Sequence, residues 1–198
     1  MLSVVVLVSG SGSNLQALLK QAANPLFPAK VLAVGSDRAC AGLEHAEQFG
    51  VPTFVVEPSQ FDSKQAWGDV LLQSIEFQKP DLVILAGFMK ILPANVVKAL
   101  SPRLINMHPS LLPEFPGAHA VRDALAAGAT KTGATIHFVD EGVDTGKVIV
   151  QEELVIPAGI SEVDLHEQIK TIERKQLVQL VSDIATGKVK IIGEASNV

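Results

Sequence analysis

The chain has 198 residues, of which 47 % are hydrophobic and 19 % are charged. This length and composition suit one globular domain with a large core and exclude a disordered chain. The net charge of −5 and the lack of a Lys/Arg stripe argue against nucleic acid as the main ligand, because binding to its phosphates needs clustered cations. We therefore expect a single domain over residues 1–198 with small-molecule substrates and no nucleic-acid partner.

Cysteine content and hydropathy indicate the compartment. Cys40 is the single cysteine, so no intramolecular disulfide is possible and a reducing environment suits the chain. The N-terminal segment lacks the basic flank and small-residue cleavage site of a signal peptide. No apolar run approaches the roughly 18 residues that a membrane span needs. These features predict a cytoplasmic protein without a membrane partner, and they leave monomer and homodimer open.

Short β-branched runs alternate with helix-like stretches up to about residue 128. The predicted strands cover residues 2–8, 30–35, 53–56, 81–86 and 103–107. The predicted helices cover residues 14–23, 42–49, 63–78 and 94–100. Such alternation is typical of parallel strands joined by crossover helices, and strands that are apolar throughout are buried on both faces. The sequence therefore predicts an α/β fold whose mostly parallel central sheet has helices on both faces.

After residue 128 the pattern changes. Residues 132–139 and 148–156 resemble two strands with no helix between them, so we expect an antiparallel C-terminal extension of the sheet. A long helix is expected from about Ser161, a residue type favoured at the N-cap, to about Thr186, before Gly187.

The first predicted strand leads into a glycine-containing turn, Ser9-Gly-Ser-Gly-Ser-Asn-Leu15, and then into a helix. Free backbone N–H groups and the positive end of the helix dipole converge at such a turn, which favours a bound phosphate. A dinucleotide fingerprint would need a third glycine in place of Leu15, although Asp37 has the position of a ribose-binding acid. We predict a monophosphate site rather than an NAD site. The alternative is a glycine turn that only starts the helix.

Asn106 and His108 lie two residues apart at the carboxyl end of a predicted strand, so their side chains are expected on one face. Ligands of open α/β sheets bind at this edge. Acyl transfer to an amine needs a donor for the developing oxyanion and a group that supplies a proton, and an amide and an imidazole provide both. The alternative interpretation is that His108 is a hydrogen-bonded structural residue.

Asp144 lies in the acidic loop 140–147, where a carboxylate close to His108 would favour the charged imidazole. The alternative is that the acidic side chains of this loop only solvate a turn. A metal site would have to use His108, His119 and His137, whose spacing matches no zinc pattern. The sequence therefore predicts no metal.

Four motifs, in order, resemble the phosphoribosylglycinamide formyltransferase family of purine biosynthesis. They are Gly10-Ser-Gly-Ser-Asn-Leu-Gln-Ala17, Leu85-Ala-Gly-Phe-Met-Lys-Ile-Leu92, Asn106-Met-His-Pro-Ser-Leu-Leu-Pro113 and His137-Phe-Val-Asp-Glu-Gly-Val-Asp-Thr-Gly146. The resemblance implies a Rossmann-like formyltransferase fold that transfers a formyl group from its co-substrate, 10-formyltetrahydrofolate, to the amine of 5'-phosphoribosylglycinamide. It also implies that the N-terminal half binds the ribonucleotide, while the C-terminal half binds folate and carries the catalytic residues.

The resemblance also implies roles for particular residues. The family's catalytic residues fall on Asn106, His108 and Asp144. Its ribonucleotide-binding residues fall on Gly12, Ser13, Asn14 and Glu173. Its folate-binding residues fall on Lys64, Met89, Lys90, Ile91, Leu92, Asn106, Asp140, Glu141 and Val143. Lys64 and Lys90 stand where relatives have arginine, and an ammonium group keeps the charge but cannot form a bidentate fork.

Other activities share part of this pattern. Initiator-tRNA formyltransferases resemble the catalytic segment, but they carry a tRNA-binding domain and usually a basic Arg-Gly sequence where this chain has Glu114-Phe-Pro-Gly117. A formyltetrahydrofolate deformylase, which is a hydrolase, normally adds an N-terminal regulatory domain. An NAD-dependent dehydrogenase would use the glycine turn and Asp37, and a non-catalytic nucleotide sensor would leave the pair Asn106 and His108 unexplained. We favour the transferase.

Overall fold

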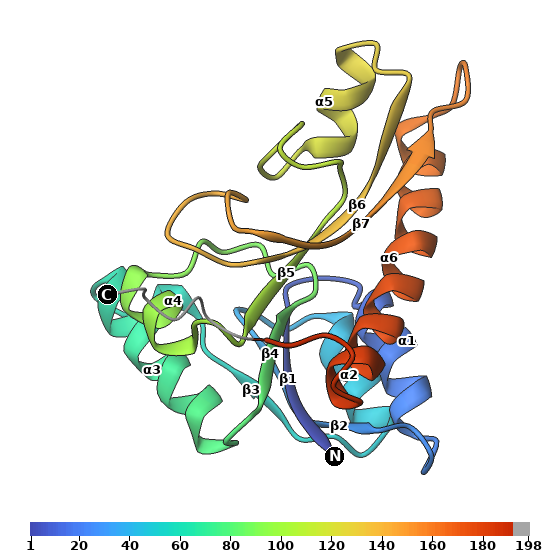
Figure 1. Ribbon diagram of the computed structural model, residues 1–198. Coiled ribbons are helices and arrows are strands. Elements are labelled where there is room, and N and C mark those ends of the chain that lie inside the picture. Colours follow the sequence, from blue (N-terminus) through green and yellow to red (C-terminus); the bar gives the residue numbers. More distant parts are fainter. Residues whose placement is uncertain (192–198) are drawn as a thin grey trace, which may run out of the picture.

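The computed structural model describes residues 1–191. In this part of the chain one seven-stranded sheet has the strand order β3-β2-β1-β4-β5-β6-β7, with helices on both faces (Figure 1). The strands are β1 (Leu2–Val8), β2 (Ala29–Ser36), β3 (Thr53–Val55), β4 (Leu82–Leu85), β5 (Leu104–His108), β6 (Lys131–Phe138) and β7 (Val148–Val155). The helices are α1 (Ser13–Ala22), α2 (Ala41–Gln48), α3 (Lys64–Phe77), α4 (Ala94–Leu100), α5 (Ala120–Ala126) and α6 (Glu162–Ala185).

Each predicted strand and helix begins and ends within one residue of the observed bounds. The sequence did not predict α5 or the short 3-10 helix η1 (Pro58–Gln60). Strands β1 to β5 pair in parallel, whereas β6 is antiparallel to β5 and β7 is antiparallel to β6. The prediction of a mostly parallel α/β sheet with an antiparallel C-terminal extension is therefore confirmed.

The alternating side chains of β1 build the cores on the two faces of the sheet. Val4, Val6 and Val8 pack into the core covered by α1, α2 and α6, and Val5 and Leu7 pack into the core covered by α3 and α4 (Figure 1). All five side chains have no exposed surface, and burying each fully contributes roughly 1.5–3 kcal/mol. A smaller third core joins α5 to α6 beneath β6.

The starts of three helices follow from their sequences. Ser63 and Ser161 cap α3 and α6, and each hydroxyl accepts a backbone N–H three residues ahead at 3.1 Å. Helix α1 instead begins after Gly12, whose φ of 67° lies in the left-handed region. A Cβ atom on Gly12 would lie 2.6 Å from the Cα of Gly42, so the backbones of α1 and α2 approach closely here.

The sheet is built outward from β1 in both directions. The chain adds β2 and β3 on one side of β1, and then β4 and β5 on the other. Open α/β sheets usually bind ligands at the carboxyl ends of the strands where the strand order reverses, which here are β1 and β4. The α1 N-terminus and the end of β5 both lie on this edge of the sheet. None of the helices in residues 1–191 is long and apolar enough to cross a lipid bilayer.

Candidate active site

Three polar side chains meet at the carboxyl end of β5. Asn106 and His108 come from β5 itself, and Asp144 comes from the loop 139–147 between β6 and β7. Met107 between them packs into the core on the other face of the sheet, so the two polar side chains share one face. The structure thus brings together the three residues to which the sequence assigned catalytic roles.

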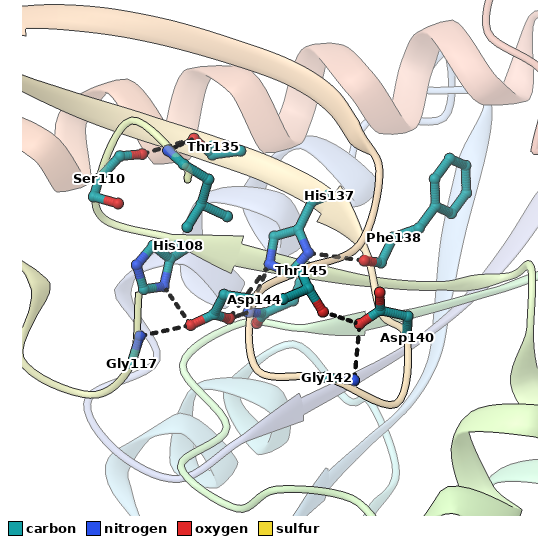
Figure 2. Close-up of polar contacts among 12 residues, drawn as sticks. His108, Ser110, Gly117, Thr135, His137, Phe138, Asp140, Gly142, Asp144 and Thr145 are labelled. Atoms are coloured by element: carbon teal, nitrogen blue, oxygen red, sulfur yellow. Dashed lines mark hydrogen bonds and ion pairs between the residues drawn. The ribbon is translucent and has the colours of Figure 1, made fainter. Parts of the chain in front are cut away.

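Asp144 makes contacts with both of its carboxylate oxygens (Figure 2). Its Oδ2 accepts the backbone N–H of Gly117 at 2.8 Å and lies 3.4 Å from His108 Nδ1. Its Oδ1 accepts from Asn106 Nδ2 at 3.3 Å and lies 3.5 Å from His137 Nε2. Only 12 % of the Asp144 side chain is exposed, so these contacts replace most of its hydration.

The charge of Asp144 follows from these contacts. Burial alone would raise the pKa of Asp144, but hydrogen bonds from His137 and from the Gly117 N–H, together with positive charge on His108 and His137, lower it to about 2. Asp144 is therefore ionised at neutral pH. A carboxylate of this pKa is a weak base, so its main contribution is the negative charge beside two imidazoles.

His108 is 4 % exposed and faces a hydrogen-bond acceptor at each ring nitrogen. Its Nε2 lies 2.8 Å from the carbonyl oxygen of Phe115, and its Nδ1 faces Asp144. A carbonyl and a carboxylate can only accept hydrogen bonds, so both contacts are satisfied together only by the imidazolium, which donates from both nitrogens. His108 thus lies between two acceptors, one at each ring nitrogen.

The sequence placed His137 in a family motif and weighed it as a metal candidate, but gave it no catalytic role; in the structure it is part of the same cluster. Strand β6 pairs His137 directly with Asn106, and its ring is 2 % exposed. Its Nδ1 donates to the carbonyl oxygen of Phe138 at 2.8 Å, and its Nε2 lies 3.5 Å from Asp144 Oδ1 and 3.2 Å from Asn106 Nδ2. The position of His137 next to Asn106 follows from the register of β6 against β5, which no local sequence pattern specifies.

The candidate metal ligands do not form a metal site. His119 is exposed at the N-cap of α5, away from the pair His108 and His137 that meets Asp144. Among residues 1–191 no three His, Cys, Asp or Glu side chains are arranged to hold a metal ion. The cluster is instead one of hydrogen bonds and charges.

Two further side chains hold the segment that follows β5. Thr135 on β6 donates to the carbonyl oxygen of Ser110 at 2.6 Å and accepts from Leu112 N–H at 3.3 Å (Figure 2). Gln151 on β7 donates to Thr135 Oγ1 at 2.8 Å and to the Leu112 carbonyl at 3.0 Å. These bonds fix the turn that carries Phe115 and Gly117 to the His108 and Asp144 side chains.

The acidic loop 139–147 is shaped by its own residues. Asp140 Oδ1 accepts the Thr145 hydroxyl at 2.7 Å and the Gly142 N–H at 3.1 Å (Figure 2). Asp144 has a φ of 55°, which is strained for a residue with a side chain. The two carboxylates of this loop therefore have different functions. Asp140 stabilises the turn through its hydrogen bonds. Asp144 points into the cluster with Asn106 and His108.

The remaining predicted folate residues have different surroundings. Met89, Ile91 and Val143 are 67 %, 63 % and 49 % exposed, so their apolar side chains are available to a ligand. Leu92 is 7 % exposed and packs into the core covered by α3 and α4, so only its backbone is available. Two other candidates lie in the open: Lys64 begins α3 with its side chain exposed, and Glu141 forms an exposed ion pair with Lys98 at 3.4 Å.

The predicted ribonucleotide residues also meet in space. Gly12 is the N-cap of α1, and Ser13 and Asn14 are the first two residues of that helix. Asn14 Nδ2 donates to Glu173 Oε2 on α6 at 3.0 Å, and both side chains are buried. No acidic residue occupies the first turn of α1, which leaves the positive end of its dipole free for an anion.

Glu173 provides a pH-dependent prediction. Burial raises its pKa above the ordinary value of about 4.5, against the opposing effects of the Asn14 hydrogen bond and the charges of Lys170 and Arg174. An acid whose pKa is raised by folding stabilises the fold below the unfolded pKa, and this stability is lost as the pH rises. Glu173→Gln should therefore increase the free energy of unfolding more at about pH 7.5 than at about pH 4.

Urea unfolding at the two pH values measures this difference. Glu47→Gln, which changes an exposed carboxyl on α2, is the control and should show no such gain. An equal effect of Glu173→Gln at both pH values would show that Glu173 titrates normally in the folded protein.

Comparisons with known proteins agree with the motifs and the geometry. Residues 2–181 match the formyl transferase family. The chain is 44 % identical over 193 residues to phosphoribosylglycinamide formyltransferase of Mycobacterium tuberculosis, covering 98 % of this chain and 89 % of that protein. It is 41 % identical over 191 residues to the Escherichia coli protein of the same name, covering 96 % and 90 %. The crystal structure of glycinamide ribonucleotide transformylase 1 from Symbiobacterium toebii matches with a TM-score of 0.92 at 38 % identity, covering 98 % and 92 % of the two chains. The chain therefore belongs to the formyl transferase family, and within it to the phosphoribosylglycinamide formyltransferases.

Proposed function

We propose that the chain transfers a formyl group from 10-formyltetrahydrofolate to the amine of 5'-phosphoribosylglycinamide, a step of purine biosynthesis. The observation that carries the proposal is the meeting of Asn106, His108 and Asp144 at the ligand edge of the sheet, in a chain of this family. We further propose that it works in the cytoplasm on small molecules, without nucleic acid or metal, as a monomer or a homodimer.

The proposed reaction begins when the substrate amine attacks the formyl carbon. The carbonyl electrons move to the oxygen, which becomes an oxyanion. Asn106 Nδ2 and His108 Nε2 donate to this oxyanion once the ligand has displaced their present partners. The intermediate then collapses, the bond from carbon to the folate nitrogen breaks, and that nitrogen takes up a proton while the attacking nitrogen loses one.

Asp144 supports these steps mainly through its charge. Its Oδ2 lies 3.4 Å from His108 Nδ1, so it stabilises the imidazolium that the oxyanion requires. Its Oδ1 contacts Asn106, so the same carboxylate also orients the amide. We assign the proton movement between the two nitrogens to His108 and solvent, with Asp144 holding His108 in its charged form.

The two substrates are assigned to opposite sides of this cluster. We place the phosphate of the ribonucleotide at the α1 N-terminus, with Gly12, Ser13 and Asn14, and its sugar near Glu173. We place the folate between the segment 87–92 and the loop 139–147. The N-terminal half then provides the ribonucleotide site, except for Glu173, which the C-terminal half supplies from its last helix.

An assay with both substrates tests the proposal. Incubation of the purified protein with 10-formyltetrahydrofolate and 5'-phosphoribosylglycinamide should yield the formylated ribonucleotide in amounts equal to the folate deformylated. A deformylase would instead release formate at the same rate without the amine, and a dehydrogenase would bind NADH with a saturable change in nicotinamide fluorescence. Either of those results, without formylated product, would overturn the assignment.

A further inference from the structure

The segment 87–92, which links β4 to α4, is a part of the proposed folate site whose backbone has no regular secondary structure. Its exposed side chains, Met89 and Ile91, are 67 % and 63 % exposed and cannot anchor it. The buried side chains of Phe88 and Leu92 anchor the segment in part, and contacts to its backbone must fix the rest, because a ligand site requires fixed groups.

Ser9, the residue after β1, makes two hydrogen bonds to the backbone of this segment. Its backbone N–H donates to the carbonyl oxygen of Gly87 at 3.1 Å, and its Oγ accepts the backbone N–H of Met89 at 2.8 Å. Phe88 lies between these two contacts and is buried, with its ring stacked on Trp67 of α3 at a centroid distance of 6.4 Å. Ser9 thus fixes the backbone on either side of a buried aromatic anchor.

Asp37 lies beside Ser9, because β1 and β2 pair in parallel with Val8 opposite Ser36. The Asp37 side chain is 1 % exposed, and its Oδ2 accepts from Arg38 Nε at 3.1 Å and Nη2 at 2.7 Å. Its other oxygen, Oδ1, is buried without a hydrogen-bond partner of its own. This buried carboxylate, already paired with Arg38, is not available as a ribose-binding acid, so Asp37 needs a different explanation.

The hydroxyl of Ser9 explains why a buried carboxylate lies at this position. Since Ser9 Oγ uses a lone pair for the Met89 N–H, its own hydrogen remains to be donated, and Asp37 is the neighbouring anion. Burial raises the pKa of Asp37, but the hydrogen bonds and the charge of Arg38 outweigh burial and lower it, so an ionised carboxylate lies beside the Ser9 hydroxyl. A hydroxyl that donates to a carboxylate is a stronger and better oriented acceptor for the next N–H.

We propose that Ser9 and Asp37 are positioning residues that fix the segment 87–92 relative to the phosphate-binding turn. Ser9 directly precedes Gly10, so one residue is continuous with the proposed ribonucleotide site and bonded to the proposed folate site. In this proposal Arg38 holds Asp37, the Asp37 carboxylate orients the neighbouring Ser9 hydroxyl, and Ser9 holds the Met89 N–H, which sets the distance between the two substrates. This inference rests on the proposed function, since it assigns folate to the segment 87–92.

Ser3 provides a matched control at the other end of the same strand. Ser3 Oγ donates to Asp81 Oδ2 at 2.6 Å and accepts the Asp81 backbone N–H at 3.1 Å, so it also joins β1 to the β4 side of the sheet. Ser3→Ala removes a comparable serine contact at the opposite edge of the sheet. A purely structural role for Ser9 would make the two alanine variants alike.

The experiment compares Ser9→Ala, Asp37→Asn, the double variant and Ser3→Ala in steady-state kinetics. Ser9→Ala should raise the KM for 10-formyltetrahydrofolate by about 5- to 30-fold, the effect of one lost buried hydrogen bond, and should change kcat less. Asp37→Asn should act in the same direction, and the double variant should show less than the product of the two single effects, because both act through one chain of contacts. Ser3→Ala should leave both constants unchanged.

Fluorescence of Trp67, the single tryptophan, gives a second readout without substrate. Acrylamide should quench it more strongly in Ser9→Ala than in the wild type or Ser3→Ala, because Phe88 is less firmly held. Equal KM values and equal quenching for Ser9→Ala and Ser3→Ala, or independent effects of Ser9→Ala and Asp37→Asn, would overturn the inference. Absence of formylated product from the wild type would instead overturn the proposed function, so the two failures are distinguishable.

Discussion

His108→Ala and Asp144→Asn are each expected to lower kcat by about 100- to 10,000-fold while the KM values of both substrates change little. His108→Ala removes the cationic donor to the oxyanion, which exists only in the transition state. Asp144→Asn removes the negative charge that stabilises the proposed imidazolium. It also replaces one carboxylate oxygen with an NH₂ group, which cannot accept from the donors around it, Asn106 Nδ2 and the Gly117 N–H. Steady-state kinetics with each substrate varied in turn measures the effect.

His119→Ala is the matched control for these variants. His119 is exposed at the start of α5 and makes no side-chain capping bond, so its removal should leave kcat unchanged. Normal turnover in His108→Ala or Asp144→Asn would refute the catalytic roles. Between about pH 5 and pH 9 Asp144 stays ionised, since its pKa is about 2, so no limb of the wild-type pH profile should disappear in Asp144→Asn alone.

Gly12→Ala is expected to raise the KM for the ribonucleotide at least about tenfold, which corresponds to about 1.4 kcal/mol of lost binding. The left-handed φ of Gly12 costs an L-residue roughly 1–2 kcal/mol. In addition, the new Cβ would lie 2.6 Å from the Gly42 Cα, so the start of α1 and its N–H groups must move. Kinetics with the ribonucleotide varied, together with thermal unfolding, separates the two consequences.

Gly50→Ala isolates the cost of the backbone conformation. Gly50 has the same φ of +67°, but a Cβ atom added there would have no other heavy atom within 4 Å. This variant should lose a similar amount of stability from its φ angle and keep the wild-type KM. If Gly12→Ala behaved like Gly50→Ala in kinetics, the glycine turn would serve only to start the helix, as the alternative interpretation of the sequence held.

The sequence predicted the sheet well because its strands and helices have strong periodic signals. β1 is apolar from Val4 to Val8 and alternates between two cores, which local sequence reveals directly. Helix α5 was missed because it has no strong pattern of its own and is stabilised by the packing of Val121 with Leu165 and Ile169 of α6, which lie far along the chain.

The candidate site was predicted in part for similar reasons. Asn106 and His108 are neighbours on one strand, so a period of two residues placed them together. His137 was not predicted in this cluster because its place depends on the register of β6 against β5, which no local pattern specifies. The buried state of Leu92 and the engagement of Asp37 by Arg38 likewise arise from how the folded chain packs around these side chains.

The contact between Asn14 and Glu173 has a consequence for synthesis on the ribosome. The two residues are separated by 159 positions, so the nascent chain carries the turn proposed to bind phosphate long before Glu173 emerges. If Asn14 and Glu173 bind the ribonucleotide as proposed, its capture requires a chain long enough for the last helix to have docked. A cell's supply of this metabolite would stabilise only finished molecules, because ligand binding favours the state that possesses the complete site.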